Sequence, residues 1–119
     1  MNNISPKMQN QIAMLQQVQQ QLQTIMQQKM NYEMSVKEAK KAEEELKNVS
    51  DDAEVFVMVG SVMIQKEKTG VAEDLTEKVE TLELRVKSLE KQEKALQTKF
   101  EQLQTQIKSA FEGGQEMAI

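Results

Sequence analysis

The sequence predicts a mainly helical fold, in which a long antiparallel two-helix coiled coil carries one β-hairpin at its base. Two long stretches place apolar residues alternately three and four positions apart, which is the spacing of a coiled-coil seam. A short β-branched stretch, Ala53–Lys66, lies between them and lacks this period. Because the two seams have similar lengths, a reversal at this stretch would lay one helix against the other. A parallel homodimer is the alternative, but it would leave the hairpin interrupting a continuous rod.

The composition limits the chemistry that is available to this chain. At 119 residues it is at most one domain, 1–119. It has no Cys and no His, and aromatic residues make up 3%, so thiolate and imidazole metal sites and His-dependent nucleophiles are excluded. The formal net charge of −4 argues against nucleic-acid binding. We therefore expect no enzyme, no cofactor and no metal site. No run is long enough to span a bilayer and no signal pattern is present, so we expect a cytoplasmic protein.

The first helix is expected at about 5–48. Ser5 can accept a hydrogen bond as the N-cap, and Pro6 suits the first helical position. Asn48–Asp52 is rich in turn-forming residues and ends the pattern. The apolar stripe is narrow, which is typical of a coiled coil rather than a globular core. Its seam positions are Met8, Gln11, Leu15, Val18, Leu22, Ile25, Lys29, Tyr32, Val36, Ala39, Glu43 and Leu46.

The β-hairpin is expected at about 53–67. Val55–Val59 is an unbroken β-branched and aromatic run, and Val62–Ile64 resumes it after Gly60-Ser61, which suits a tight turn. A buried helical segment is the alternative reading, since periodicity alone does not separate the two. One hairpin is barely stable in water, and this one is apolar on both faces. It therefore needs strands that the chain itself does not contain.

The second helix is expected at about 70–112. Thr69 is a plausible cap, and Glu73 and Asp74 suit the positive end of a helix. Gly113-Gly114 is expected to end the helix and to leave a mobile tail, 113–119. The second seam consists of Leu75, Val79, Leu82, Val86, Leu89, Glu93, Leu96, Phe100, Leu103, Ile107 and Ala110.

One charged residue interrupts each seam, and the two are expected to form a pair. An antiparallel register that places Leu46 near Leu75 brings Lys29 level with Glu93, or within one layer of it. A lone charge in an apolar seam would be costly, whereas a pair whose ends reach solvent is tolerated. Its use would be to penalise slipped registers rather than to add stability. The alternative is that both side chains bend into solvent.

Three segments carry a family resemblance: Asp51–Phe56 (DDAEVF), Val59–Ile64 (VGSVMI) and Leu89–Lys94 (LEKQEK). With the order helix, hairpin, helix, the chain resembles the β-class subunit of archaeal prefoldin along nearly its whole length. The resemblance implies a hexamer of two α-class and four β-class subunits, in which the hairpins join an inter-subunit β-barrel. It also implies an ATP-independent chaperone, a holdase that binds unfolded polypeptides at the coiled-coil tips and delivers them to a group II chaperonin.

Two sets of residues follow as candidates. The oligomerisation set consists of the apolar residues of the expected hairpin: Val55, Phe56, Val57, Met58, Val59, Val62, Met63 and Ile64. The client-binding set consists of apolar residues that are expected at the coiled-coil tip, near both termini: Ile4, Met8, Ile12, Met14, Ile107 and Phe111. Met8 and Ile107 also belong to the seam, and the bland alternative for this set is scattered surface hydrophobes.

Two other functions compete with a holdase. A structural or tethering coiled coil would assemble through the hairpin without binding clients. A helix that lies on a membrane surface is disfavoured, because the polar faces are rich in Gln and Glu rather than basic residues. We expect neither nucleic-acid nor membrane binding.

Overall fold

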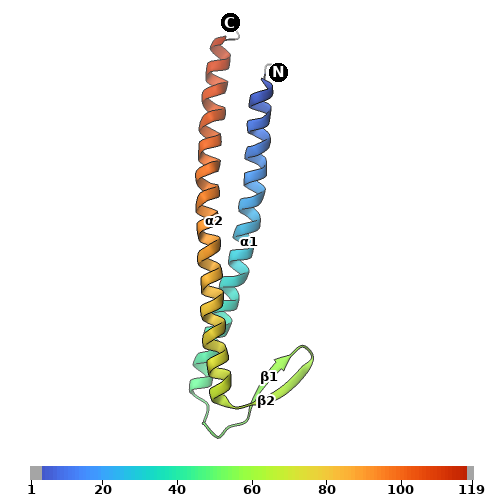
Figure 1. Ribbon diagram of the computed structural model, residues 1–119, viewed down its shortest axis with the longest axis vertical. Helices are drawn as coiled ribbons and strands as arrows, with labels where there is room; N and C mark the ends of the chain where they lie inside the picture. The colour runs from blue at the N-terminus through green and yellow to red at the C-terminus, as the bar shows by residue number, and fades with distance from the viewer. Residues whose placement is uncertain (1–3, 118–119) are drawn as a thin grey trace. The chain divides into compact units, whose positions relative to one another are not determined.

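The computed structural model describes residues 4–117 and contains two long helices joined by a two-stranded sheet (Figure 1). In chain order these are α1 (Pro6–Lys47), β1 (Val55–Val59), β2 (Val62–Lys66) and α2 (Lys68–Met117). The chain forms two compact units. We call residues 29–87 the hairpin unit, and residues 1–28 with 88–119 the terminal unit. The predicted element order and the mainly helical class are confirmed.

Helix α1 begins at the predicted cap. The Met8 backbone N–H donates to Ser5 Oγ at 3.1 Å, and the Gln9 N–H donates to the Ser5 carbonyl at 2.9 Å. The Ser5 side chain therefore satisfies one of the N–H groups that every helix start leaves without an internal partner, and its carbonyl accepts the first regular helical hydrogen bond. Pro6 has no N–H to satisfy, so the first helical position costs nothing.

The sheet is an antiparallel hairpin, as predicted. Its register pairs Val57 with Ile64 and Val59 with Val62 across the two-residue turn Gly60-Ser61. Gly60 has a φ of 62°, and no other described residue has a positive φ. A positive φ at the first central position alone is the signature of a type II′ turn, whose twist matches that of the strands. The glycine thus fixes the hairpin register.

Helix α2 differs from the prediction at both ends. It begins at Lys68, where the Val71 N–H donates to the Glu67 carbonyl at 3.1 Å, so Thr69 lies in the first turn and is not the cap. Glu73 and Asp74 consequently lie beyond that turn and its unpaired N–H groups.

The expected helix end at Gly113-Gly114 is also wrong, since α2 continues to Met117. The expected mobility of 113–119 stays a prediction. Two glycines cost about 1 kcal/mol each relative to Ala in a helix interior, which weakens a helix without ending it. No proline follows that would force a stop. The last two positions of the predicted tail, 118–119, lie outside the described residues.

Within each unit, α1 and α2 run antiparallel and bury the predicted seam (Figure 1). All twelve seam positions of α1 are buried or half-buried. Leu46, Val79 and Leu82 are among the buried residues of the hairpin unit, and Val18 and Leu103 among those of the terminal unit.

Ala110 is the exception, because it is exposed. The second seam therefore ends at Ile107, which is half-buried.

Candidate functional site

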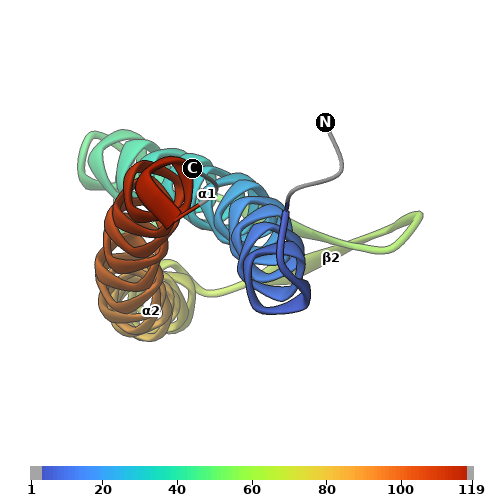
Figure 2. The ribbon, with the colours of Figure 1, turned by 90° about the horizontal axis from the view of Figure 1, so that it is seen from above.

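Half of the twelve large apolar residues that are exposed in the described part of the chain lie on the hairpin, and we call its eight apolar residues the hairpin surface. Val55 and Val57 are half-buried. The other six are exposed: Phe56 at 48%, Met58 at 62%, Val59 at 53%, Val62 at 56%, Met63 at 62% and Ile64 at 42%. Figures 1 and 2 both show β1 and β2 projecting sideways from the adjoining ends of α1 and α2. The helices of the hairpin unit therefore leave most of this surface uncovered.

The register divides the hairpin surface into two faces, because successive strand residues point to opposite sides. One face is β-branched and consists of Val55, Val57, Val59, Val62 and Ile64. The other consists of Phe56, Met58 and Met63, with Gln65 beside Phe56. Among the described residues the sheet has only these two strands, so the outer edges of β1 and β2 have no strand partner. The hairpin is thus an incomplete sheet with two apolar faces.

Lys68 anchors the hairpin to the helices. Its Nζ donates to the Val49 carbonyl at 2.7 Å and to Asp51 Oδ1 at 3.1 Å. Its side chain is only 21% exposed, so these contacts are partly shielded from water. Lys66 Nζ lies 3.9 Å from Asp74 Oδ2 and links the end of β2 to α2. Sequence reasoning missed Lys68; a basic residue at the first position of the second helix, across the hairpin from the carbonyl end of the first, was the available signal.

The structure separates the predicted client-binding residues by exposure. Met8 is buried at 7%, so its side chain packs in the seam. Ile4, Ile12 and Ile107 are half-buried. The exposed members are Met14 at 41% and Phe111 at 53%. Nothing in this geometry tests client binding, and the set stays a prediction.

Lys29 and Glu93 are both half-buried, as their seam positions require. Each has an interaction partner in the structure. Their pairing with one another stays a prediction.

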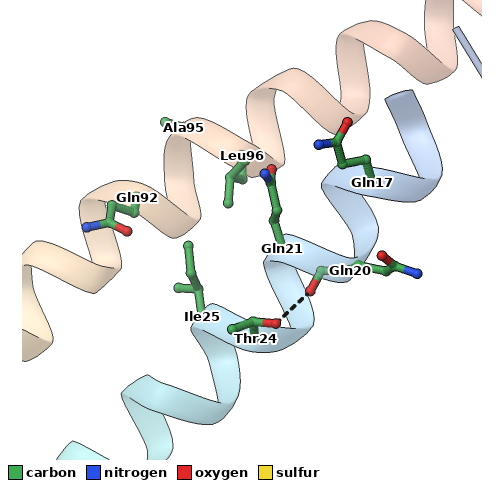
Figure 3. A pocket seen from close by; sticks show the side chains of 8 residues that line it. All are labelled: Gln17, Gln20, Gln21, Thr24, Ile25, Gln92, Ala95 and Leu96. Carbon is green, nitrogen blue, oxygen red and sulfur yellow. Dashed lines mark hydrogen bonds between the residues drawn. The ribbon is translucent and has the colours of Figure 1, made fainter. Parts of the chain in front are cut away.

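A groove runs between α1 and α2 in the terminal unit, with a volume of about 710 Å³. Its lining is rich in glutamine and consists of Gln17, Gln20, Gln21, Thr24, Ile25, Gln92, Ala95 and Leu96. We call it the glutamine groove. Figure 3 shows Gln21 and Ile25 pointing from α1 toward α2, and Leu96 pointing from α2 toward them. The sequence showed the density of glutamine on α1, but not that α2 adds Gln92 to the same groove.

Two features are absent from the part of the chain that the structure describes. There, no three or more Asp or Glu side chains gather in a way that could hold a metal ion. Over the same residues, neither helix has a stretch apolar and long enough to cross a membrane.

The chain is similar in sequence to a known protein family. The model of the family described as "Prefoldin subunit" matches residues 9–114. The prefoldin subunit beta of Methanosphaerula palustris is 65% identical over 114 residues, which cover 96% of this chain and 94% of the relative. That of Methanoculleus marisnigri is 62% identical over 116 residues, which cover 98% and 96%.

A solved structure agrees with these relatives. The crystal structure of the prefoldin beta subunit from Thermococcus strain KS-1 superimposes with a TM-score of 0.84 at 43% identity, covering 92% of this chain and 96% of that one. The element order, the exposed hairpin and these similarities lead to one conclusion: the chain belongs to the prefoldin subunit family, and its similarity is to the beta subunits of archaea.

Proposed function

We propose that this chain is the β-class subunit of an ATP-independent holdase that assembles through its hairpin and captures unfolded polypeptides near the chain termini. Membership of the prefoldin subunit family gives it a chaperone role in general and an assembly with other prefoldin subunits. The finer proposal is a cytoplasmic hexamer of two α-class and four β-class subunits that passes clients to a group II chaperonin and catalyses no reaction.

The exposed hairpin surface is the observation that carries the assembly step. Six of its apolar side chains are at least 42% exposed, and two strand edges have no partner among the described residues. Burial in a closed barrel would supply several kcal/mol per subunit at roughly 25 cal/mol per Å², before the entropy cost of association. A closed barrel would also remove the edges, which otherwise invite aggregation.

Client capture is proposed in the terminal unit. Met14 and Phe111 expose apolar surface there, and Ile12 is half-buried beside the seam. A methionine side chain is flexible and polarizable, so it adapts to irregular apolar segments of many sequences. Seam residues such as Met8 would contribute packing rather than client contact.

The test compares the removal of exposed apolar side chains from the proposed client site with the removal of exposed apolar side chains elsewhere. The variant Met14→Ser/Phe111→Ser should assemble with the α-class subunit to an unchanged mass but lose most suppression of aggregation of a chemically unfolded protein. The matched control, Met30→Ser/Leu84→Ser, removes two side chains that are 55% and 67% exposed in the hairpin unit. It should retain both assembly and suppression.

A tethering role is the second candidate, and the same experiment separates it. A tether would assemble but would not suppress aggregation, even as the unaltered protein. Suppression that survives in the Met14/Phe111 variant would instead move the client site away from these residues.

A further inference from the structure

We infer that the glutamine groove binds the backbone of an extended, uncharged segment of an unfolded polypeptide, a subsite that would lengthen the client surface proposed above and that rests on that proposed function. The groove would act by hydrogen bonding to peptide groups. The exposed apolar residues Met14 and Phe111 would act by apolar contact.

The lining combines an apolar floor with an amide rim. Ile25 and Leu96 are half-buried seam residues that point toward each other's helix, and Ala95 adds little bulk beside them (Figure 3). Gln17, Gln21 and Gln92 stand around this floor. The seam here is open enough to expose part of its own apolar surface.

The rim offers unused hydrogen-bonding capacity. Each glutamine amide has two donor hydrogens and an acceptor oxygen, which is the same combination that a peptide group needs. Thr24 Oγ1 donates to the Gln20 carbonyl at 3.1 Å, a contact within α1. No hydrogen bond within the described residues occupies the side-chain amides of Gln17, Gln21 or Gln92. Peptide groups of a bound segment would pair with these amides and avoid the cost of burial without a partner.

The charge pattern identifies the class of occupant. None of the eight lining residues is charged, and α1 has no Asp, Glu, Lys or Arg between Lys7 and Lys29. A neutral groove offers no attraction to nucleic acid or to an anionic membrane, both of which require basic residues. A third helix would require a continuous apolar stripe, whereas the rim is polar. An extended chain, with its repeated peptide groups and small apolar side chains, matches both the rim and the floor.

Length and continuity support the same occupant. From Gln17 to Ile25 the groove follows α1 for about 12 Å at 1.5 Å per residue, which is the length of three to four extended residues at about 3.3 Å each. Met14 precedes Gln21 by one heptad, so the two occupy equivalent positions on the same face of α1. A segment held by Met14 would therefore continue along the groove.

The experiment is a two-by-two comparison on the full chain assembled with its α-class partner. One axis compares the unaltered protein with Gln17→Ala/Gln21→Ala/Gln92→Ala, since alanine preserves the helices. The other compares a 20-residue neutral peptide of Gly, Ser, Leu and Val, carrying an uncharged dye, with the same peptide N-methylated at alternate backbone amides. Fluorescence anisotropy reports the four dissociation constants.

We expect N-methylation to weaken binding to the unaltered protein about fivefold, which is what the loss of about one net hydrogen bond implies. The same modification should change binding to the triple-alanine variant by less than twofold. Gln16→Ala/Gln23→Ala/Gln102→Ala, a control that removes three exposed amides outside the groove, should behave as the unaltered protein does. Circular dichroism checks that both triple variants keep their helices.

Two failures have separate meanings. If the unaltered assembly suppresses aggregation but N-methylation weakens its binding and that of the triple variant equally, the groove is not a backbone site and the inference is overturned. If the unaltered assembly neither binds the peptide nor suppresses aggregation, the proposed holdase function is overturned and the groove with it.

Discussion

The hairpin unit and the terminal unit differ in the polar contacts that join α1 to α2 within each of them. In the hairpin unit, Lys40 Nζ lies 3.6 Å from Glu83 Oε2, and the Arg85 guanidinium lies 5.6 Å from the centre of the Tyr32 ring. In the terminal unit, Gln11 Nε2 donates to Gln106 Oε1 at 3.3 Å. Charged partners discriminate strongly between correct and slipped registers, whereas amides can exchange one amide partner for another.

This difference separates two requirements within one chain. The segments that carry the hairpin need a fixed register, because the hairpin surface must be presented in one orientation. The segments proposed to hold clients need adaptability, because unfolded polypeptides have no common shape. The exposed ion pairs of the hairpin unit add little stability by themselves, so their value lies mainly in specificity. Four predictions test this division, from the largest expected effect to the smallest.

The largest effect is expected from placing charge in the β-branched face of the hairpin. Val57→Asp/Ile64→Asp sets two carboxylates directly opposite each other, where burial would be costly and like charges repel. Assembly with the α-class subunit should be lost, and light scattering should report a monomer whose circular dichroism remains helical.

Ser61→Asp is the control for this variant, since it adds a charge at the exposed turn and should leave assembly intact. The companion variant Met58→Asp/Met63→Asp charges the opposite face at another directly paired position. It shows whether that face is also buried on assembly. If both double variants formed a complex of unchanged mass with the α-class subunit, assembly through the hairpin would be contradicted.

A smaller effect is expected from the lysine that anchors the hairpin. Lys68→Met removes the hydrogen bonds to the Val49 carbonyl and Asp51 but keeps most of the aliphatic bulk. The free energy of unfolding should fall by about 1–2 kcal/mol, because charge-assisted bonds on a partly buried group are stronger than neutral ones. Urea unfolding at a fixed protomer concentration measures it.

Lys47→Met is the matched control. Lys47 pairs with Glu44 at 3.5 Å, but the two side chains are 72% and 75% exposed. Its loss should cost less than about 0.5 kcal/mol. Equal effects of the two substitutions would show that Lys68 has no special anchoring role.

The seam of the terminal unit should gain stability from an apolar substitution. Gln11 Oε1 is buried and accepts no hydrogen bond from any described residue. Gln11→Leu removes this oxygen and adds apolar burial at a seam position, so the unfolding free energy should rise by about 1 kcal/mol. Gln9→Leu, at an exposed position, should change it by less than about 0.5 kcal/mol. A destabilised Gln11→Leu protein would show that the amide contact with Gln106 is worth more than apolar packing.

The smallest effect is expected at the Arg85–Tyr32 contact. A double-mutant cycle with Arg85→Gln and Tyr32→Leu should give a coupling energy of about 0.5 kcal/mol, as for other exposed cation–π pairs. If the single-mutant effects on thermal unfolding were additive, the Arg85–Tyr32 contact would not help to set the register.

The heptad spacing was sufficient to predict the helices and the seam, whereas the hairpin was predicted from its β-branched residues and the glycine between them. Burial alternates by three and four along α1, since only a partner helix on one stripe is available to exclude water from Val18 or Leu46. The β-branched residues on both sides of Gly60 likewise required a turn with a positive φ.

The predictions that failed concern ends and non-local contacts. Local signals placed a helix end at Gly113-Gly114 and a cap at Thr69, but neither preference outweighs the continuity of a long helix. Ala110 keeps the heptad spacing but is exposed, so spacing alone did not predict its burial. The contact of Lys68 with Val49 and the glutamine groove, which joins Gln92 to α1, each combine residues that are remote in sequence, and helical periodicity does not predict such pairs.

The contacts that join α1 to α2 and those beside the hairpin also differ in the length of the loop that each contact closes. Val49 and Lys68 are separated by 19 positions, whereas Gln11 and Gln106 are separated by 95. For a flexible chain the closure entropy rises with the logarithm of this separation, so the second contact costs about 1.4 kcal/mol more to close. The turn at Gly60 can close within about 1–10 μs. The helix turns around Gln11 and Gln106 would then pair last during folding and part first in a fluctuation, so the end proposed to receive clients would open without any hinge.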